Sequence, residues 1–172
     1  MARTNRIRIT GAALLAVLAA ACAGSFDGHN LEAGRATAAD VVATMGEPAL
    51  TLKRPDGESL LYFERYQTGP AMFVARIGAD GVLRGIEQRL TWVNTHKVHA
   101  DMRAEAVREL LGPPFEITNW PRQQRDSWEY PYRHAVRERR VLFVMFSYDG
   151  VVREVIDRHD EARDPESAFG GR

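Results

Sequence analysis

Two stretches of the sequence follow one pattern: Thr37-Ala38-Ala39-Asp40-Val41-Val42-Ala43-Thr44-Met45-Gly46-Glu47-Pro48 and Arg103-Ala104-Glu105-Ala106-Val107-Arg108-Glu109-Leu110-Leu111-Gly112-Pro113-Pro114. Each carries apolar residues at helical spacing and then a glycine, which ends a helix, and a proline, which cannot continue it. In the first stretch Thr37 is a good N-cap, and Asp40 stands in the first turn, where a carboxylate is favoured. Gly46 and Gly112 are separated by the same distance along the chain as Pro48 and Pro114. The chain therefore contains an internal repeat.

The segments that follow each helix are rich in β-forming residues. Segment 60–65 corresponds to 128–133, with a slightly longer loop before it in the second unit, and the later segments are 72–77 and 82–90 in the first unit and 141–148 and 151–156 in the second. Asp-Gly pairs at 80–81 and 149–150 supply hairpin turns. Pro131 lacks an amide hydrogen, which indicates an edge strand or a bulge. We predict an α+β fold of two tandem units, each a short helix packed on a small three-stranded antiparallel sheet, with the option that the sheets join into one.

Segment 1–21 has the layout of a secretory signal peptide. Basic residues Arg3, Arg6 and Arg8 precede an apolar run over 9–18, and small residues follow. The run is shorter than the roughly 20 residues of a membrane span. We predict a signal peptide at 1–21, a lipidated tether at 22–33, unit one at 34–92, unit two at 93–157 and a disordered tail at 158–172.

The stretch Leu18-Ala19-Ala20-Ala21-Cys22 resembles the lipobox of bacterial lipoproteins. It departs from that motif in having Ala19 where leucine is commoner. The resemblance implies cleavage before Cys22, a diacylglycerol on its thiol and an acyl chain such as palmitate on its amine. Ala23 in place of aspartate implies an anchor in the outer membrane, facing the periplasm. The alternative is an ordinary signal peptide with an incidental cysteine.

The charge balance excludes a general affinity for nucleic acid. Lys and Arg number 23, as do Asp and Glu, and removal of 1–21 takes away three arginines and no acid, so the remainder is mildly acidic. Cys22 is the one cysteine in the sequence. The folded part therefore has no cysteine for a disulfide, a thiolate nucleophile or a sulfur-ligated metal.

The second unit carries motifs that resemble a known family. They are the helix end at 110–114, the segment 127–133 (SWEYPYR) and the turn at 148–152 (YDGVV), and together they are similar to the SmpA/OmlA domain of BamE-like lipoproteins. The resemblance covers about residues 31–157 and implies a role in outer-membrane protein assembly. The tandem arrangement resembles instead the architecture of β-lactamase inhibitory protein.

Motifs for catalysis are not found: there is no G-x-S-x-G, P-loop or H-E-x-x-H. His96 and His99 with Asp101 would share one face of a helix and could hold a metal, but such residues in a charged linker are more often solvated, and we predict no metal and no cofactor. The remaining acids are scattered. A hydrolase would need some of them to meet in a cleft with perturbed pKa values.

Segment 120–140 combines arginines with aromatic residues, the residue types that dominate protein interfaces. We predict that it binds an acidic protein surface or anionic lipid headgroups through Trp120, Arg122, Arg125, Tyr132, Arg133, Arg137, Arg139 and Arg140. The alternative is a hairpin with a solvated basic loop and its aromatic residues in the core. Core positions are expected at Tyr62, Phe73, Trp128, Phe143 and Val144.

These patterns favour a non-enzymatic adaptor that is anchored to the outer membrane and binds envelope proteins, with the β-barrel assembly machinery as one candidate partner. The alternative function is an inhibitor or sequestering protein for a periplasmic enzyme. A hydrolase is the third hypothesis.

Overall fold

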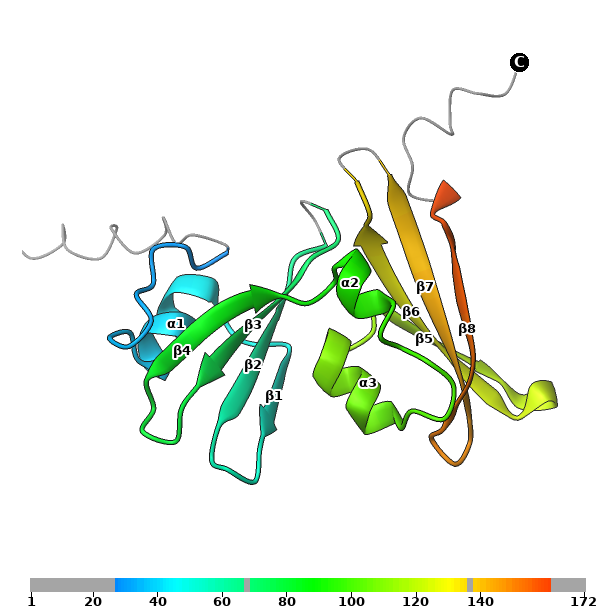
Figure 1. Cartoon of the computed structure of the whole chain (residues 1–172), viewed down its shortest axis with the longest axis horizontal. Coiled ribbons are helices and arrows are strands. Elements are labelled where there is room, and N and C mark those ends of the chain that lie inside the picture. The colour runs from blue at the N-terminus through cyan, green and yellow to red at the C-terminus, as the bar shows by residue number, and fades with distance from the viewer. Residues whose placement is uncertain (1–26, 67–68, 136–137, 162–172) are drawn as a thin grey trace, which may run out of the picture.

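Two units of the same build follow one another along the chain in the computed structural model, which describes residues 27–66, 69–135 and 138–161 (Figure 1). Unit one contains α1 (Ala38–Met45), β1 (Leu50–Lys53), β2 (Ser59–Glu64), β3 (Met72–Ile77) and β4 (Leu83–Gln88). The short α2 (Trp92–Thr95) leads to unit two, which contains α3 (Ala104–Leu111), β5 (Glu116–Trp120), a 3-10 turn (Pro121–Gln123), β6 (Arg125–Arg133), β7 (Arg139–Ser147) and β8 (Val152–His159). The predicted signal segment 1–21 and Cys22 lie outside the described residues.

The predicted α+β class and the helix-on-sheet units are confirmed. Both sheets are antiparallel, with the strand orders β1-β2-β3-β4 and β5-β6-β7-β8, and they remain separate. Each has four strands where the sequence predicts three, because the strand segments predicted from the sequence include neither β1 nor β5. Pro131 pairs with Val141 of β7, but it lies beyond Glu129, the last β6 residue in register with β5. Its missing amide hydrogen therefore costs the β5–β6 pairing nothing.

Both helices end as the repeat predicts. Thr37 caps α1 through a capping box with Asp40, and the hydrogen bonds that Asp40 accepts from Thr37 hold the pKa of its carboxyl below the usual value. Gly46 and Gly112 follow the helices with φ values of +85° and +89°, in a region that favours glycine. Chain direction after each helix is therefore set by a glycine.

Sheet one is buried on both faces. Along β2 the residues Leu60 to Phe63 are all buried. Leu61 and Phe63 pack with Val41 of α1 in one cluster, whereas Leu60 and Tyr62 belong to a second cluster that also contains residues of unit two. A strand with two buried faces has no polar alternation, which explains its continuous apolar sequence.

Helix α3 lies between the two sheets (Figure 1). Its buried residues Val107 and Leu111 share one cluster with Tyr62 of sheet one and with Trp128 and Tyr130 of sheet two. The two tyrosines also bind the end of the helix: Tyr62 Oη donates to the Glu109 carbonyl at 2.6 Å, and Tyr130 Oη donates to the Gly112 carbonyl at 3.2 Å. Carbonyls in the last turn have no partner within the helix, so these bonds join both sheets to α3.

The observed strand pairing aligns the repeat strands β2 and β6 one position away from the predicted correspondence of 60–65 with 128–133. Leu61 packs with α1 and Trp128 with α3, so these two residues are equivalent. Ala49 likewise donates to the Tyr62 carbonyl as Phe115 does to the Glu129 carbonyl. The predicted alignment pairs Tyr62 with Tyr130. Tyr62 faces away from α1, the helix of its own unit, whereas Tyr130 faces α3, the helix of its own unit, so the two are not equivalent. A slip of one residue exchanges the two faces of a strand.

The unit boundaries extend beyond the predicted ones. Leu31, in the predicted tether, packs on the cluster under α1. At the other end β8 continues to His159, and Asp160 is buried, so the ordered sheet passes the predicted start of the tail at residue 158. Within the described residues, no helix is long and apolar enough to cross a membrane.

Candidate functional site

The predicted basic and aromatic residues separate into two groups at opposite ends of β6. Trp120, Arg122 and Arg125 lie at the hairpin that joins β5 to β6, and the other described members lie where β6 passes into β7. Arg125 and Arg133 stand at the two ends of one strand, about 26 Å apart at ~3.3 Å per residue. The structure therefore does not form the single basic surface that the sequence predicted.

The first group forms a hairpin surface, which we define as Trp120, Arg122, Arg125 and Tyr148. Trp120 and Tyr148 are 46% and 56% exposed. Asn119 Nδ2 lies 2.6 Å from Asp126 Oδ1 and 3.5 Å from Tyr148 Oη, which connects the hairpin to the β7–β8 turn. Arg125 is ion-paired with Glu154 at 3.2 Å, and Arg122 is exposed.

The second group is held within the fold. Tyr132 is completely buried, and its hydroxyl donates to Asp157 at 2.7 Å, so its predicted role in partner binding is wrong. Burial, followed by the bond to Asp157, raises the pKa of Tyr132 to about 12. Arg140 donates to Asp157 at 3.0 Å and to Glu138 at 3.1 Å, and the bond to Asp157 raises the pKa of its guanidinium.

The remaining arginines of this group differ in exposure. Arg133 is exposed, and its guanidinium lies against Gly69 of the β2–β3 connection. Arg139 is half-buried, and its carbonyl accepts a hydrogen bond from the amide of Asp160. Arg137 lies outside the described residues. This end of β6 therefore presents less exposed charge than its sequence indicates.

The pair His96 and His99 does not share a helical face, because α2 ends at Thr95. His96 Nδ1 lies 2.9 Å from the Trp92 carbonyl, and His99 Nδ1 lies 2.7 Å from the Ala100 carbonyl. In the part of the chain that the structure describes, no three or more His, Cys, Asp and Glu side chains could hold a metal ion.

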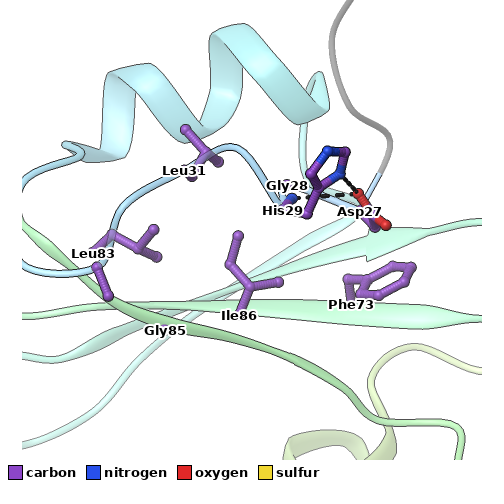
Figure 2. Close-up of a pocket in the computed structure, with 9 residues that line it drawn as sticks. Asp27, Gly28, His29, Leu31, Phe73, Leu83, Gly85 and Ile86 are labelled. Carbon is purple, nitrogen blue, oxygen red and sulfur yellow. Dashed lines mark hydrogen bonds and ion pairs between the residues drawn. The ribbon is translucent and has the colours of Figure 1, made fainter.

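A hollow of about 330 Å³ lies beside β4, below α1 (Figure 2). Its apolar part is formed by Leu31, Phe73, Leu83 and Ile86. His29 Nδ1 lies 2.8 Å from Asp27 Oδ1 near the opening, and both side chains are largely exposed. The described residues that line the hollow include no hydroxyl or thiol that this pair could activate as a nucleophile.

Three acidic residues, Glu129, Asp160 and Glu161, line one open hollow of about 430 Å³ beside β8. Burial raises the pKa of Glu64, but this residue lies at the end of β2 and lines neither that hollow, nor the hollow of Figure 2, nor a third one beside Tyr66 and Phe115. Asp80 and Asp149 have lowered pKa values because they accept hydrogen bonds in their turns. The described carboxyl groups with shifted pKa values therefore do not gather in any of these hollows, and the structure adds no support to the hydrolase hypothesis.

Comparison with known proteins finds no family model and no curated protein that matches the chain. Several solved structures overlap with it, among them the following two. A DUF4309 family protein (YjgB) from Bacillus subtilis is 19% identical, with 77% of this chain and 84% of that chain covered, at a TM-score of 0.29. A proposed beta-lactamase inhibitor protein from Streptococcus mutans is 10% identical, with 71% and 82% covered, at a TM-score of 0.28.

The second neighbour agrees in name with the predicted resemblance to β-lactamase inhibitory protein, and the SmpA/OmlA resemblance finds no support. TM-scores this low establish no common function.

The sequence did not predict the exposure of the strand that leads into the hairpin surface. Every residue of β5 is exposed, and Ile117 is 52% exposed. Phe115, just before β5, is 42% exposed and makes an edge-to-face contact with Tyr66, their ring centroids 4.8 Å apart. A strand is recognised in a sequence by alternation between buried and exposed residues, and this strand has no buried face, so the sequence does not predict it.

Proposed function

We propose that this chain is an exported, lipid-anchored and non-enzymatic adaptor that binds another envelope protein through its hairpin surface. The observation that supports the proposal is the exposure of Trp120, Arg122 and Tyr148 together at one end of sheet two. Signal segment 1–21 and Cys22 would supply the location, on the periplasmic face of the outer membrane. The β-barrel assembly machinery is one candidate partner.

The chemistry of the hairpin surface suits an acidic protein. Tryptophan, tyrosine and arginine contribute most binding energy at interfaces, because they combine a large contact area with directed hydrogen bonds. Arg122 can form a two-pronged bond with a carboxylate. Anchoring to a membrane would raise the local concentration, so that a small surface is sufficient for binding.

The test is chemical cross-linking in intact cells, followed by isolation of the chain and mass spectrometry. We expect the double variant Trp120→Ala/Arg122→Glu to reduce the yield of a specific envelope partner at least tenfold. Trp92→Ala/Lys97→Glu is the matched control, since Trp92 is also 46% exposed but lies on α2. Equal losses in both variants, or no loss in either, would remove the hairpin surface from the proposal.

The other hypotheses make different predictions in the same cells. An inhibitor would form a stoichiometric complex with an enzyme whose activity falls, whereas an adaptor leaves its partner active. Binding to anionic headgroups would appear as sedimentation with anionic vesicles that Arg122→Glu abolishes. Anchoring is tested separately with Cys22→Ser, which should abolish palmitate labelling and release the chain from outer-membrane fractions.

A further inference from the structure

Strand β5 forms the most exposed of the four sheet edges. The order of the strands places β1 and β4 at the edges of sheet one and β5 and β8 at the edges of sheet two. An edge strand presents backbone N–H and C=O groups that can pair with another strand, so folded proteins cover or block such edges. We therefore compare how the described residues treat each edge.

Three edges are covered or blocked. Gly34 and Ala36 exchange hydrogen bonds with Leu83 at the start of β4, and Asp101 and Met102 do the same with Val152 at the start of β8. Both edges are also interrupted by a register shift. On β1 the alternate residues Leu50 and Leu52 pack on the core, and the next residues are Lys53, Arg54 and Pro55.

Strand β5 lacks the covering hydrogen bonds, the register shift and the alternating core contacts of the other edges, although Pro121 and Arg122 follow it. All five residues are exposed on both faces, and the register with β6 runs without a shift from Glu116 to Trp120. The strand contains no proline, glycine, lysine or arginine. It combines Ile117 and Trp120, 52% and 46% exposed, with the strand-forming residue Thr118 between them.

We propose that β5 pairs in antiparallel fashion with β5 of a second copy of this chain, so that the two sheets become one across a two-fold axis. The register that pairs all five residues places Thr118 opposite Thr118 of the second copy. Glu116 then lies opposite Trp120, two residues from Arg122. The edge is acidic at its start and basic just past its end, so the antiparallel arrangement brings opposite charges together at both ends, whereas a parallel one would bring like charges together.

The expected dimer is weak. Five paired residues on each side bury much less than the roughly 800 Å² per partner of a standard interface. Association in solution should thus be reversible and dependent on concentration, and restriction to a membrane surface would favour it. The inference does not rest on the proposed function, because it concerns the backbone edge of β5 and holds or fails whatever the hairpin surface binds.

A cysteine at the two-fold axis gives a direct test. Residues directly opposite in an antiparallel pair have Cα atoms about 4.5–5.5 Å apart, within the range of a disulfide. The purified full chain carrying Cys22→Ser and Thr118→Cys should form a disulfide-linked dimer under mild oxidation. Thr51→Cys in the same background is the control, since Thr51 is an exposed threonine on the edge strand β1. We expect at least fivefold more dimer from Thr118→Cys, and equal yields would overturn the proposal.

A charge exchange tests the register without a cross-link. Glu116→Arg and Arg122→Glu should each weaken association at least fivefold in sedimentation equilibrium, because each brings like charges together at both ends. The double variant Glu116→Arg/Arg122→Glu should restore it. Failure of the double variant to recover would contradict the antiparallel pairing. If that variant dimerises but captures no partner in cells, the inference stands and the hairpin surface needs Arg122 itself.

Discussion

Replacement of Gly112 by alanine would measure how closely α3 is pressed against sheet one. Gly112 and its repeat equivalent Gly46 have nearly the same backbone conformation, with φ and ψ of +89° and −169° against +85° and −170°. Alanine in this region costs about 1–3 kcal/mol at either position. The two glycines therefore share their backbone cost, and any difference between the variants comes from their surroundings.

Those surroundings differ sharply. A Cβ at Gly46 would have no heavy atom within 4 Å, whereas a Cβ at Gly112 would lie 2.8 Å from Met72 Cγ and 3.0 Å from Tyr62 Cδ1. Both neighbours belong to sheet one and are completely buried. Forcing a methyl group into a packed core costs about 1–3 kcal/mol, so Gly112→Ala should lower the free energy of unfolding by that much more than Gly46→Ala.

Urea denaturation at 25 °C measures the difference. With a slope of about 2 kcal/mol per molar urea, an extra cost of about 2 kcal/mol moves the midpoint by about 1 M. The cost of Gly112→Ala should also decrease in a Met72→Ala background, since the truncated side chain frees the space. Equal midpoints for Gly46→Ala and Gly112→Ala would refute the packing of α3 against sheet one.

Three further substitutions test the contacts on which the fold depends. Tyr130→Phe should lower the free energy of unfolding by about 1 kcal/mol or more, because the buried Gly112 carbonyl loses its donor, and Tyr148→Phe at the exposed hairpin surface should have no effect in the same urea titration. Asp40→Asn should destabilise the chain at pH 7. The lowered pKa of Asp40 gives stability that is fully present above the unfolded value of 3.8 and is lost as the pH falls through the lower folded value, so melting temperatures measured from pH 7 downwards should show the gap between the two chains begin to close only below pH 3.8. Asp157→Asn should destabilise the chain, because Tyr132 and Arg140 both donate to this carboxylate. Glu154→Gln, which removes an ion pair with Arg125 at the surface, should change the midpoint little.

The parts of the fold that local chemistry determines could be predicted from the sequence. Both helix ends follow from Gly46 and Gly112, and both late hairpins follow from their Asp-Gly turns. Strand β5 could not be found, because it has no buried face and hence no alternation. The predicted alignment of β2 with β6 is wrong by one position. It places Tyr62 opposite Tyr130, but only Tyr130 faces the helix of its own unit.

The candidate site was predicted in part for a similar reason. Residue types identified the hairpin surface at Trp120 and Arg122, but sequence proximity also included Tyr132 and Arg140, which lie in and beside the core. Alternation along β6 decides which of these side chains point inward, and the length of the strand separates its two ends. Neither is visible in composition.

The corrected register shows that sheet two does not repeat the apolar face to which α3 binds on sheet one. The face of sheet one that receives α3 is apolar at Leu50, Leu52, Leu60 and Tyr62. The equivalent positions of sheet two are polar: Glu116, Thr118, Ser127 and Glu129. A third helix would bury these polar groups without partners, at a cost of about 1–3 kcal/mol each.

The first helix shows the same pattern at the other end of the stack. Thr44 of α1 stands where α3 has Leu110, which packs on the core between the sheets, so α1 offers no second apolar face to a preceding sheet. On sheet two, Glu116 and Thr118 are both part of the polar end face and members of β5. The polar residues at these positions are therefore also exposed residues of the edge strand β5. If β5 pairs with a second copy, backbone hydrogen bonds at the edge of sheet two join the two chains, whereas a shared apolar core joins the two units within one chain.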